Sequence, residues 1–410
     1  MYRMSAMEAA GSGGVGRTTL AGLCANLVGI GLARFAYAPL IPALIAAQWL
    51  LPAEAVYLGA ANLAGYLAGA LLARGMTARF PITVVLRAMM VLATIAFFAC
   101  ALPLSFLWFS IWRFAAGLAG GTLMVLAALT VLTHVPLSRR GVVGGIVFTG
   151  VGLGIAASGI VVPLLLRLGL TATWCGLGVL SLMLTLAAWS GWPTGPALVA
   201  ARDMPMIRGA GHSPSRRALK ALYAEYALNA VGLVPHMVFL VDFVARGLGR
   251  GIASGAQDWV IYGIGAVAGP VLAGWLADAI GFGAALRLAY VVQAVAVAIL
   301  SMVTGTAVLI VSSLVVGAFT PGIVPLVLGR VHELADGREH EAGWSVATTA
   351  FALGQAGAAY GCAALFARTG EYRLLFLLGG VALLLALVID LVAARRVPSA
   401  PAGPVDRVRL

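Results

Sequence analysis

Two arginines and one short polar series lie inside stretches that are otherwise apolar, and their chemistry suits the binding of a charged solute. Arg34 is in the middle of the apolar run 20–47. At about 1.5 Å per residue this run is long enough to cross a bilayer about 30 Å thick. An arginine at that depth costs roughly 2.5–3.5 kcal/mol, so its guanidinium should face protein, water or an anion. Because Pro39 and Pro42 follow and remove backbone donors, the run predicts a broken helix in a solute pathway.

The polar series lies in the run 217–244. Its members occupy positions i, i+4, i+7 and i+11 and therefore share one face of a helix: Glu225, Asn229, Gly232 and His236. A polar face of this kind belongs to a cavity rather than to lipid. Since an imidazole titrates near neutral pH, His236 can carry a proton, with Glu225 as a second candidate. The alternative for His236 is a packed histidine that bonds a carbonyl group.

Other polar side chains extend this candidate site. On the first run Asn26 and Tyr37 are eleven residues apart on one face, and Arg34 lies about 80° away around the helix. Arg113 lies about 10 Å inside the run 106–133. Its alternative role is structural, as a guanidinium that ties carbonyl groups of neighbouring helices. We expect these side chains to bind substrate: Asn26, Arg34, Tyr37, Arg113, Asn229 and His236. We expect these to couple protons: Arg113, Glu225 and His236.

The elements that position these residues are long helices. The chain is 62% hydrophobic and 10% charged, with a mean hydropathy of +1.02, which excludes a soluble globular domain. Twelve apolar runs, without the alternation of a membrane barrel, predict an all-α membrane protein with twelve transmembrane helices. The runs cover residues 20–47, 54–73, 82–103, 106–133, 141–166, 171–193, 217–244, 254–277, 284–305, 307–330, 343–367 and 371–394.

The basic residues fall mainly on one side of the predicted membrane. With the N-terminus inside, the outer loops hold only Arg167, Arg246, Arg250, Arg368 and Arg373 of the 26 lysines and arginines. This asymmetry places both termini in the cytoplasm. It also explains the net charge of +12, since a basic face beside anionic lipids requires no nucleic-acid partner.

The chain divides into two similar halves. We predict an N-terminal six-helix bundle at 1–193, a cytoplasmic linker at 194–216, and a C-terminal bundle with a cytoplasmic tail at 217–410. Matches at offsets near 200 residues, such as Gly117 with Gly317 and Arg87 with Arg287, indicate a repeat. Two repeats with substrate at their interface are a recurring design of secondary transporters.

The segment after the eighth run carries a family signature. Gly274-Trp275-Leu276-Ala277-Asp278-Ala279-Ile280-Gly281, followed by Leu286-Arg287, resembles the G-x-L-A-D-x-x-G-x-x-x-x-L-R motif of the major facilitator superfamily. The resemblance covers essentially the whole chain and implies the major facilitator fold, two pseudo-symmetric six-helix bundles. It also implies gating roles for Asp278 and Arg287. In the first half an alanine, Ala73, replaces the motif's aspartate, so a latch of this type should be asymmetric. The alternative for Asp278 is a solvated loop acid.

Three further segments are similar to the bacterial YbfB/YjiJ-type subfamily. They are GLARFAYAPLIPAL in the first run, AANLAGYLAGALLA in the second, and PHMVFLVDFVARGLG at 235–249. Arg113 and Gly117 resemble the superfamily's R-x-x-x-G pattern, which is implicated in proton coupling in some members. The superfamily plan implies that the first, fourth, seventh and tenth runs line one central cavity. Two smaller expectations are an interhelical hydrogen bond from Gln355 and a surface ion pair between Asp390 and Arg395 or Arg396.

The sequence contains no catalytic or phosphate-binding motif, and its four cysteines form no CxxC or CxxH pair. We therefore expect no enzyme activity, no cofactor, no metal and no nucleic-acid partner. The expected function is secondary active transport of a small solute, coupled to protons, with an organic anion as substrate. The alternatives are a proton-coupled exporter of drugs or metabolites, and a non-transporting sensor or assembly factor. We expect a monomer, in contact with lipids, in a bacterial inner membrane.

Overall fold

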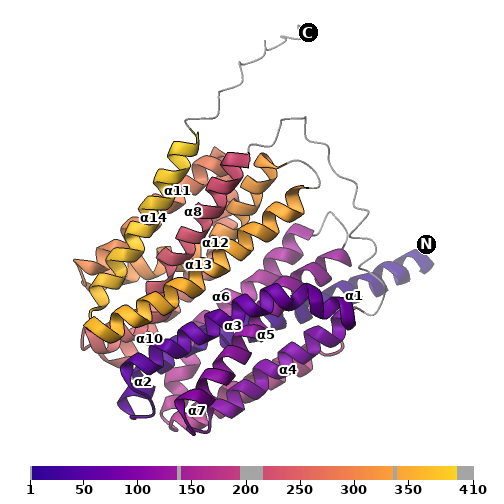
Figure 1. The fold of residues 1–410 in the computed structure, drawn as a ribbon. Coiled ribbons are helices and arrows are strands. Elements are labelled where there is room, and N and C mark those ends of the chain that lie inside the picture. Colours follow the sequence, from indigo (N-terminus) through magenta and orange to yellow (C-terminus); the bar gives the residue numbers. More distant parts are fainter. Residues whose placement is uncertain (1, 136–139, 194–215, 336–338, 395–410) are drawn as a thin grey trace.

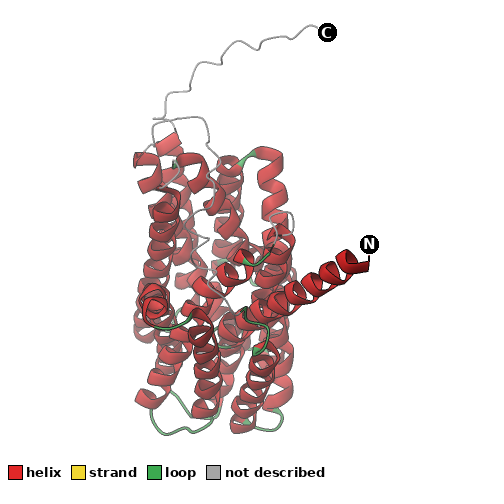
Figure 2. Cartoon of the chain, turned by 90° about the vertical axis from the view of Figure 1, so that its right-hand side faces the viewer, coloured by secondary structure: helices red, strands yellow, loops and turns green. Residues whose placement is uncertain are grey.

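The computed structural model describes residues 2–135, 140–193, 216–335 and 339–394, and all regular elements in these ranges are helices (Figure 2). Within the same ranges, twelve helical segments of 19 to 33 residues are long and apolar enough to span a membrane. The prediction of twelve transmembrane helices is therefore confirmed. The predicted linker 194–216, apart from residue 216, and the tail 395–410 lie outside the described residues, so the domain boundaries remain predictions.

The helices form two bundles that lie side by side, indigo to magenta and red to yellow in Figure 1. The N-terminal half contains α1 (Tyr2–Asn26), η1 (Leu27–Leu32), η2 (Phe35–Leu40), α2 (Ile41–Ala46), α3 (Pro52–Arg79), α4 (Ile82–Cys100), α5 (Phe106–Thr133), α6 (Arg140–Leu166) and α7 (Leu170–Ala188). The C-terminal half contains α8 (Arg216–Val234), η5 (Pro235–Phe239), α9 (Leu240–Asp242), η6 (Phe243–Gly247), α10 (Gly251–Ile280), α11 (Phe282–Ala298), η7 (Ile299–Ser301), α12 (Thr306–Leu334), α13 (Glu339–Thr369) and α14 (Tyr372–Ala394). We call the end of the bundle at which α8 begins and α14 ends the terminal end, and the opposite end the far end.

The first and seventh spans are interrupted at similar positions. The first span passes from α1 through a π-helical turn, η1, and a 3₁₀ helix, η2, before α2. The seventh passes from α8 into the π-helical segments η5 and η6, which flank α9. Pro39 lies inside η2 and Pro235 begins η5, and neither can donate a backbone hydrogen bond. The predicted break in the first span is confirmed, although it begins before Arg34, at Leu27, rather than at the prolines.

Each half is held together by a pair of helices in backbone contact. In the N-terminal half a methyl group in place of the Gly117 hydrogen would lie 1.9 Å from the carbonyl oxygen of Asn62. In the C-terminal half the same change at Gly317 would place it 2.0 Å from the carbonyl oxygen of Tyr262. Only glycine permits such an approach of α3 to α5 and of α10 to α12. Because both contacts recur at an offset of 200 residues, the repeat is also a structural repeat.

The two halves meet mainly where α6 packs on α10 and α3 packs on α13. A Cβ atom at Gly152 of α6 would lie 2.5 Å from the backbone nitrogen of Val267 of α10. Closer to the far end, a Cβ atom at Gly159 would lie 3.0 Å from the carbonyl oxygen of Ala256. Here, too, small residues allow helices to approach closely.

Toward the terminal end the same two helices separate. Gly145 precedes Gly152 by seven residues and Gly274 follows Val267 by seven, so both continue the contacting faces. A Cβ atom at either glycine would have no other atom within 4 Å. Along α6 and α10 the halves are thus in contact toward the far end and not in contact at Gly145 and Gly274, toward the terminal end.

Candidate functional site

Arg34 lies in the break of the first span and is only partly buried. Its guanidinium lies 5.0 Å from the ring centroids of Phe35 and Tyr66, and its Nη2 is 3.8 Å from Met237 Sδ. Its Nε donates to no protein acceptor in the structure. No described carboxylate lies within ion-pair distance of this side chain. Aromatic faces therefore hold the cation in place without neutralising its charge.

Arg113 lies in α5 next to the same break. Its Nη1 donates to the carbonyl oxygen of Ala33 at 2.7 Å, and its guanidinium lies 4.3 Å from the Tyr37 ring centroid. The irregular turn after η1 exposes this carbonyl, and an unpaired carbonyl inside a membrane protein is costly. Asn62 of α3 supports the arrangement, because its Nδ2 donates to the carbonyl oxygen of Arg113 at 3.0 Å. These contacts match the structural alternative for Arg113.

A central pocket, shared by the two halves, contains both arginines. Its lining is Arg34, Phe35, Tyr37, Ala38, Ile41, Gly59, Asn62, Leu63, Arg113, Met237 and Val238. The first nine come from the turn before η2, from η2, α2, α3 and α5, and the last two come from η5. The structure thus brings three predicted site residues together, Arg34, Tyr37 and Arg113. It adds Asn62, which the sequence analysis missed although a lone asparagine in an apolar run was a visible signal.

Three other predicted residues face neighbouring helices rather than the central pocket. Asn26 Nδ2 donates to the carbonyl oxygen of Val147 in α6 at 2.9 Å. Asn229 Nδ2 donates to Gln293 Oε1 in α11 at 3.1 Å. Both asparagines are fully buried, so in this conformation they join helices within one half.

His236 is the third of these residues, and it is fully enclosed. Its Nε2 lies 2.8 Å from Ser312 Oγ, and that hydroxyl donates to the carbonyl oxygen of Ala296 at 2.6 Å. Since the serine proton is used in this way, Nε2 is the donor to Ser312 Oγ. Nδ1 has no partner, and the ring packs edge-on against Phe376. His236 is thus packed, as in the alternative interpretation, although its partner is a serine hydroxyl rather than a carbonyl group.

A second pocket lies at the terminal end of the C-terminal half. It is lined by Ala218, Leu222, Glu225, Arg330, Leu334, Asp390 and Ala393, from α8, α12 and α14. We call it the Glu225 pocket. Glu225 is 2% exposed, and its Oε2 has no hydrogen-bond partner.

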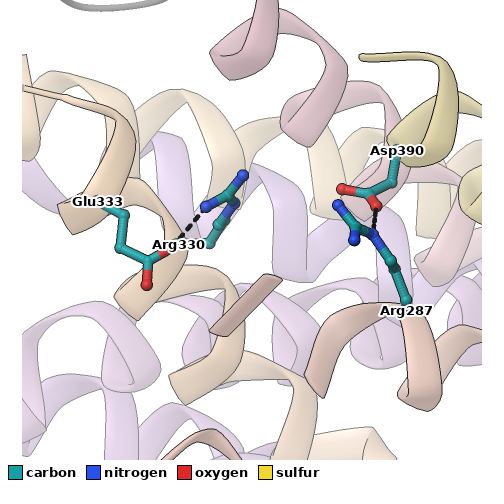
Figure 3. A network of polar contacts seen from close by, with 4 residues as sticks. All are labelled: Arg287, Arg330, Glu333 and Asp390. Atoms are coloured by element: carbon teal, nitrogen blue, oxygen red, sulfur yellow. Dashed lines mark hydrogen bonds and ion pairs between the residues drawn. The ribbon is translucent and has the colours of Figure 1, made fainter. Parts of the chain in front are cut away.

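Two ion pairs lie beside this pocket (Figure 3). Arg330 Nη1 and Glu333 Oε2 of α12 are 2.6 Å apart, and Arg287 Nε of α11 donates to Asp390 Oδ2 of α14. Asp390 is 6% exposed and pairs with Arg287 of α11, so the expectation of a surface position was wrong. The expected partners, Arg395 and Arg396, lie outside the described residues.

The repeat explains the place of Arg287. Its counterpart in the first half is Arg87, whose Nε and Nη2 donate to the carbonyl oxygen of Trp189 at 3.1 and 2.7 Å. Arg287 thus bonds a carboxylate where Arg87 bonds a carbonyl. The other predicted gating residue, Asp278, is exposed at the end of α10 and has no ion-pair partner among the described residues.

The remaining predictions concern cysteines and metals. All four cysteines are free thiols. Among the described residues, no group of three His, Cys, Asp or Glu side chains could hold a metal ion.

Gln355 donates from Nε2 to Met237 Sδ at 3.4 Å, an interhelical contact between α13 and η5 as expected.

A family model described as "Uncharacterised MFS-type transporter YbfB" matches residues 26–391, nearly the whole of both bundles. The chain belongs to this family of the major facilitator superfamily. As a major facilitator protein it is a multi-pass membrane protein and a secondary transporter of a small molecule, not an enzyme. No curated protein sequence matches it.

Solved structures of major facilitator proteins have the same fold. A crystal structure of a D-xylose-proton symporter has a TM-score of 0.73 at 16% identity, over 91% of this chain and 96% of that one. The xylose transporter XylE from E. coli matches in a partially occluded inward open conformation, with a TM-score of 0.73 at 16% identity, over 95% of this chain and 99% of that one. It also matches in an inward open conformation, with a TM-score of 0.73 at 15% identity, over 95% and 98%. At these identities the similarity establishes the fold of this facilitator, and the two-bundle prediction is confirmed.

Proposed function

We propose that this facilitator moves an organic anion across the bacterial inner membrane together with protons. The observation that carries the proposal is Arg34, a cation at the interface of the two halves that no described carboxylate neutralises. A bound carboxylate would supply the missing charge and accept two N–H groups from the guanidinium.

The distribution of charge supports this proposal. Glu8 and Glu54 are the only acidic residues before position 194, and Glu54 Oε2 accepts from the backbone N–H of Leu51 at the start of α3. The positive charges of Arg34 and Arg113 therefore belong to a half of the molecule that has almost no acids. The electrostatic potential of this half therefore favours the binding of an anion at the interface over that of a cation or a neutral solute.

Proton coupling is supported by the acids of the other half. Glu225 is buried in the C-terminal half and has no protein donor, so a proton is the simplest way to stabilise it. The fold adds a weaker argument, because one of the solved structures with this fold is that of a D-xylose-proton symporter. We assign coupling first to Glu225, with His236 and Arg113 as secondary candidates.

We infer the orientation of the chain in the membrane from the loops, because the loops on one side hold most of the arginines. We place the terminal end, and with it both termini, in the cytoplasm, and we propose a monomer surrounded by lipid. Along α6 and α10 the halves are then closed toward the outside and separated toward the cytoplasm, as in an inward-facing conformation. A substrate would reach Arg34 from the cytoplasmic side in this state.

The competing function is an exporter of drugs or metabolites that exchanges protons. The aromatic residues around Arg34 favour it in part, since Phe35 and Tyr66 could contact an apolar solute. A sensor or assembly factor on the same fold is less well supported, because such a protein would have no need to retain a cation in the membrane interior.

The experiment that tests the proposal is uptake by proteoliposomes containing the purified full-length chain. Panels of monocarboxylates, dicarboxylates, sugars and organic cations are each supplied with and without an imposed pH gradient. We expect accumulation above equilibrium for a carboxylate, only when the gradient is present. Accumulation of organic cations alone, with protons moving in the opposite direction, would contradict the anion proposal in favour of the exporter.

A further inference from the structure

The Glu225 pocket is separate from the central pocket, and the two have no lining residue in common. The Glu225 pocket lies entirely within the C-terminal half, and its last lining residues on α12 and α14, Leu334 and Ala393, are close to the terminal ends of those helices. It is therefore positioned to exchange a small ion with the solution at the terminal end without opening the interface of the two halves.

The charges around this pocket do not balance. Arg287 is paired with Asp390 and Arg330 with Glu333, so one carboxylate neutralises the charge of each arginine. Among the described carboxylates around this pocket, Glu225 is the one without an ion pair. The Tyr290 hydroxyl of α11, within electrostatic reach of Glu225, is also buried and has no partner.

These features identify the ion that the pocket can take. Glu225 is almost fully buried, forms no ion pair among the described residues, and has no hydrogen-bond partner for its Oε2. A carboxylate in such a place is strongly disfavoured in its ionised form. A metal ion would have to bind beside Arg330 and Arg287, both within electrostatic reach of Glu225, and would be repelled by them. A proton requires only the carboxyl oxygen itself.

We infer that the Glu225 pocket is the proton-binding site of this transporter, and that Arg330 becomes the partner of Glu225 when the proton leaves. The inference rests on the proposed proton-coupled transport and assigns its proton to one site. On release the proton passes from the carboxyl oxygen to water at the terminal end. The Glu225 carboxylate then accepts an N–H from Arg330, while water solvates the partly exposed Glu333 carboxylate.

Arg330 lies on α12, and this helix connects the Glu225 pocket with residues near the central pocket. Pro321 and Pro325 interrupt the hydrogen bonding of α12 between Arg330 and the middle of the membrane. Just before them, Thr320 is hydrogen-bonded to Tyr262, which lies within electrostatic reach of Arg34. A shift of Arg330 toward α8 would therefore move the part of α12 that follows this weakened segment.

Infrared spectroscopy of the full-length chain in lipid nanodiscs tests the inference without any substrate. We expect the wild type at neutral pH to show the C=O band of a protonated buried carboxyl group, and Glu225→Gln to lack it. Glu225→Asp, which keeps a carboxyl group, should retain a band at a shifted frequency and guards against misfolding of the glutamine variant. Glu371→Gln, which removes an exposed acid at the far end, should leave the band unchanged.

The role of Arg330 is tested by Glu333→Gln. This change leaves Arg330 without its carboxylate partner, so Arg330 can stabilise the ionised form of Glu225. We therefore expect the carboxyl band to fall by at least half at the same pH. A band that persists in Glu225→Gln, or that Glu333→Gln does not change, would overturn the inference. So would a band that appears in the wild type only when sodium is replaced by choline, because the pocket would then bind a metal cation. The solute panel is independent of these spectra, so anion transport could stand if the proton site failed.

Discussion

Arg34 and Arg113 line the same pocket, but they have different partners and should respond differently to substitution. Arg113 donates to the carbonyl oxygen of Ala33 and lies against Tyr37, both within its own half. Arg34 extends toward Met237 in the other half and, within the described part of the chain, bonds neither a carbonyl oxygen nor a carboxylate. We therefore assign structural stability to Arg113 and ligand affinity to Arg34.

Arg34→Lys should fold and reach the membrane at wild-type levels but bind the anion at least about tenfold more weakly, a loss of ~1.4 kcal/mol. The reason is that an ammonium group cannot reproduce the two-pronged contact of a guanidinium with a carboxylate. The measurement is the ligand-dependent rise in melting temperature, with a carboxylate from the uptake panel as ligand.

Arg17→Lys is the matched control, because Arg17 lies on the same span and is exposed. It should keep the full rise in melting temperature. A full rise in Arg34→Lys as well would mean that Arg34 does not touch the ligand.

Arg113→Ala should destabilise the protein in the absence of any ligand. The substitution leaves the Ala33 carbonyl without its charged donor, which costs about 1–3 kcal/mol when the group is buried. We expect a lower melting temperature of the purified protein and less of it in the membrane. Wild-type values of both quantities would show that the contact with Ala33 is dispensable, and would return Arg113 to the list of ligand-binding residues.

At the scale of elements, the contact of α3 with α5 and that of α10 with α12 make each half rigid. Gly65 approaches the carbonyl oxygen of Phe114, and Gly265 approaches that of Leu314, at distances of 2.0 and 2.2 Å from a Cβ atom built on each glycine. The broken first and seventh spans are built differently, because their backbone is irregular where they line or border the central pocket. The molecule thus combines rigid pairs with weak segments, as a transporter with moving halves requires.

Gly117→Ala should prevent the close packing of α3 on α5. Its methyl group would lie 1.9 Å from a backbone oxygen, and two helix backbones cannot relax as a side chain can. Overpacking typically costs 1–3 kcal/mol, and we expect about the upper value here. The measurement is the yield of monodisperse protein after extraction, together with its melting temperature.

Gly75→Ala provides the comparison, since a Cβ atom at this position of α3 meets nothing within 4 Å. Its yield should equal that of the wild type. Equal yields for both alanine variants would contradict backbone contact between α3 and α5.

At the scale of the whole molecule, the separation of α6 from α10 predicts which positions are accessible to solvent. In a variant without the native cysteines, single cysteines at Gly145 and Gly274 should react with a membrane-impermeant maleimide supplied from the cytoplasmic side. A cysteine at Gly159, in the closed part, should not react, and its bulk makes expression a necessary check. Labelling of Gly145→Cys only from the outside would contradict the proposed orientation.

The same reagent tests the alternation between conformations. A substrate that closes the cytoplasmic side should slow labelling at Gly145→Cys and Gly274→Cys together, because the two helices approach each other. A substrate that slows neither position would argue against closure along α6 and α10.

The sequence by itself determined the class of this protein and its division into halves. Hydropathy and run length depend on each segment alone, and the cost of exposing backbone to lipid leaves the helix as the solution for each of the twelve runs. The offset of 200 residues was also visible, and Gly117 and Gly317 proved to be equivalent contacts. The charge of Arg34 in mid-membrane drew attention to the central pocket for the same local reason.

Only the tertiary structure decided which partners these side chains meet. Glu225, Asn229 and His236 share a helix face, and periodicity predicted one common cavity for them. They are instead distributed along α8 and η5, so Glu225 faces α12 and α14, Asn229 contacts α11, and His236 contacts α12. Periodicity defines the face of a helix, whereas the tilt and packing of its neighbours define what that face touches at each depth. The pairing of Asp390 with Arg287, about a hundred residues away, is a consequence of that packing and has no signal in the local sequence.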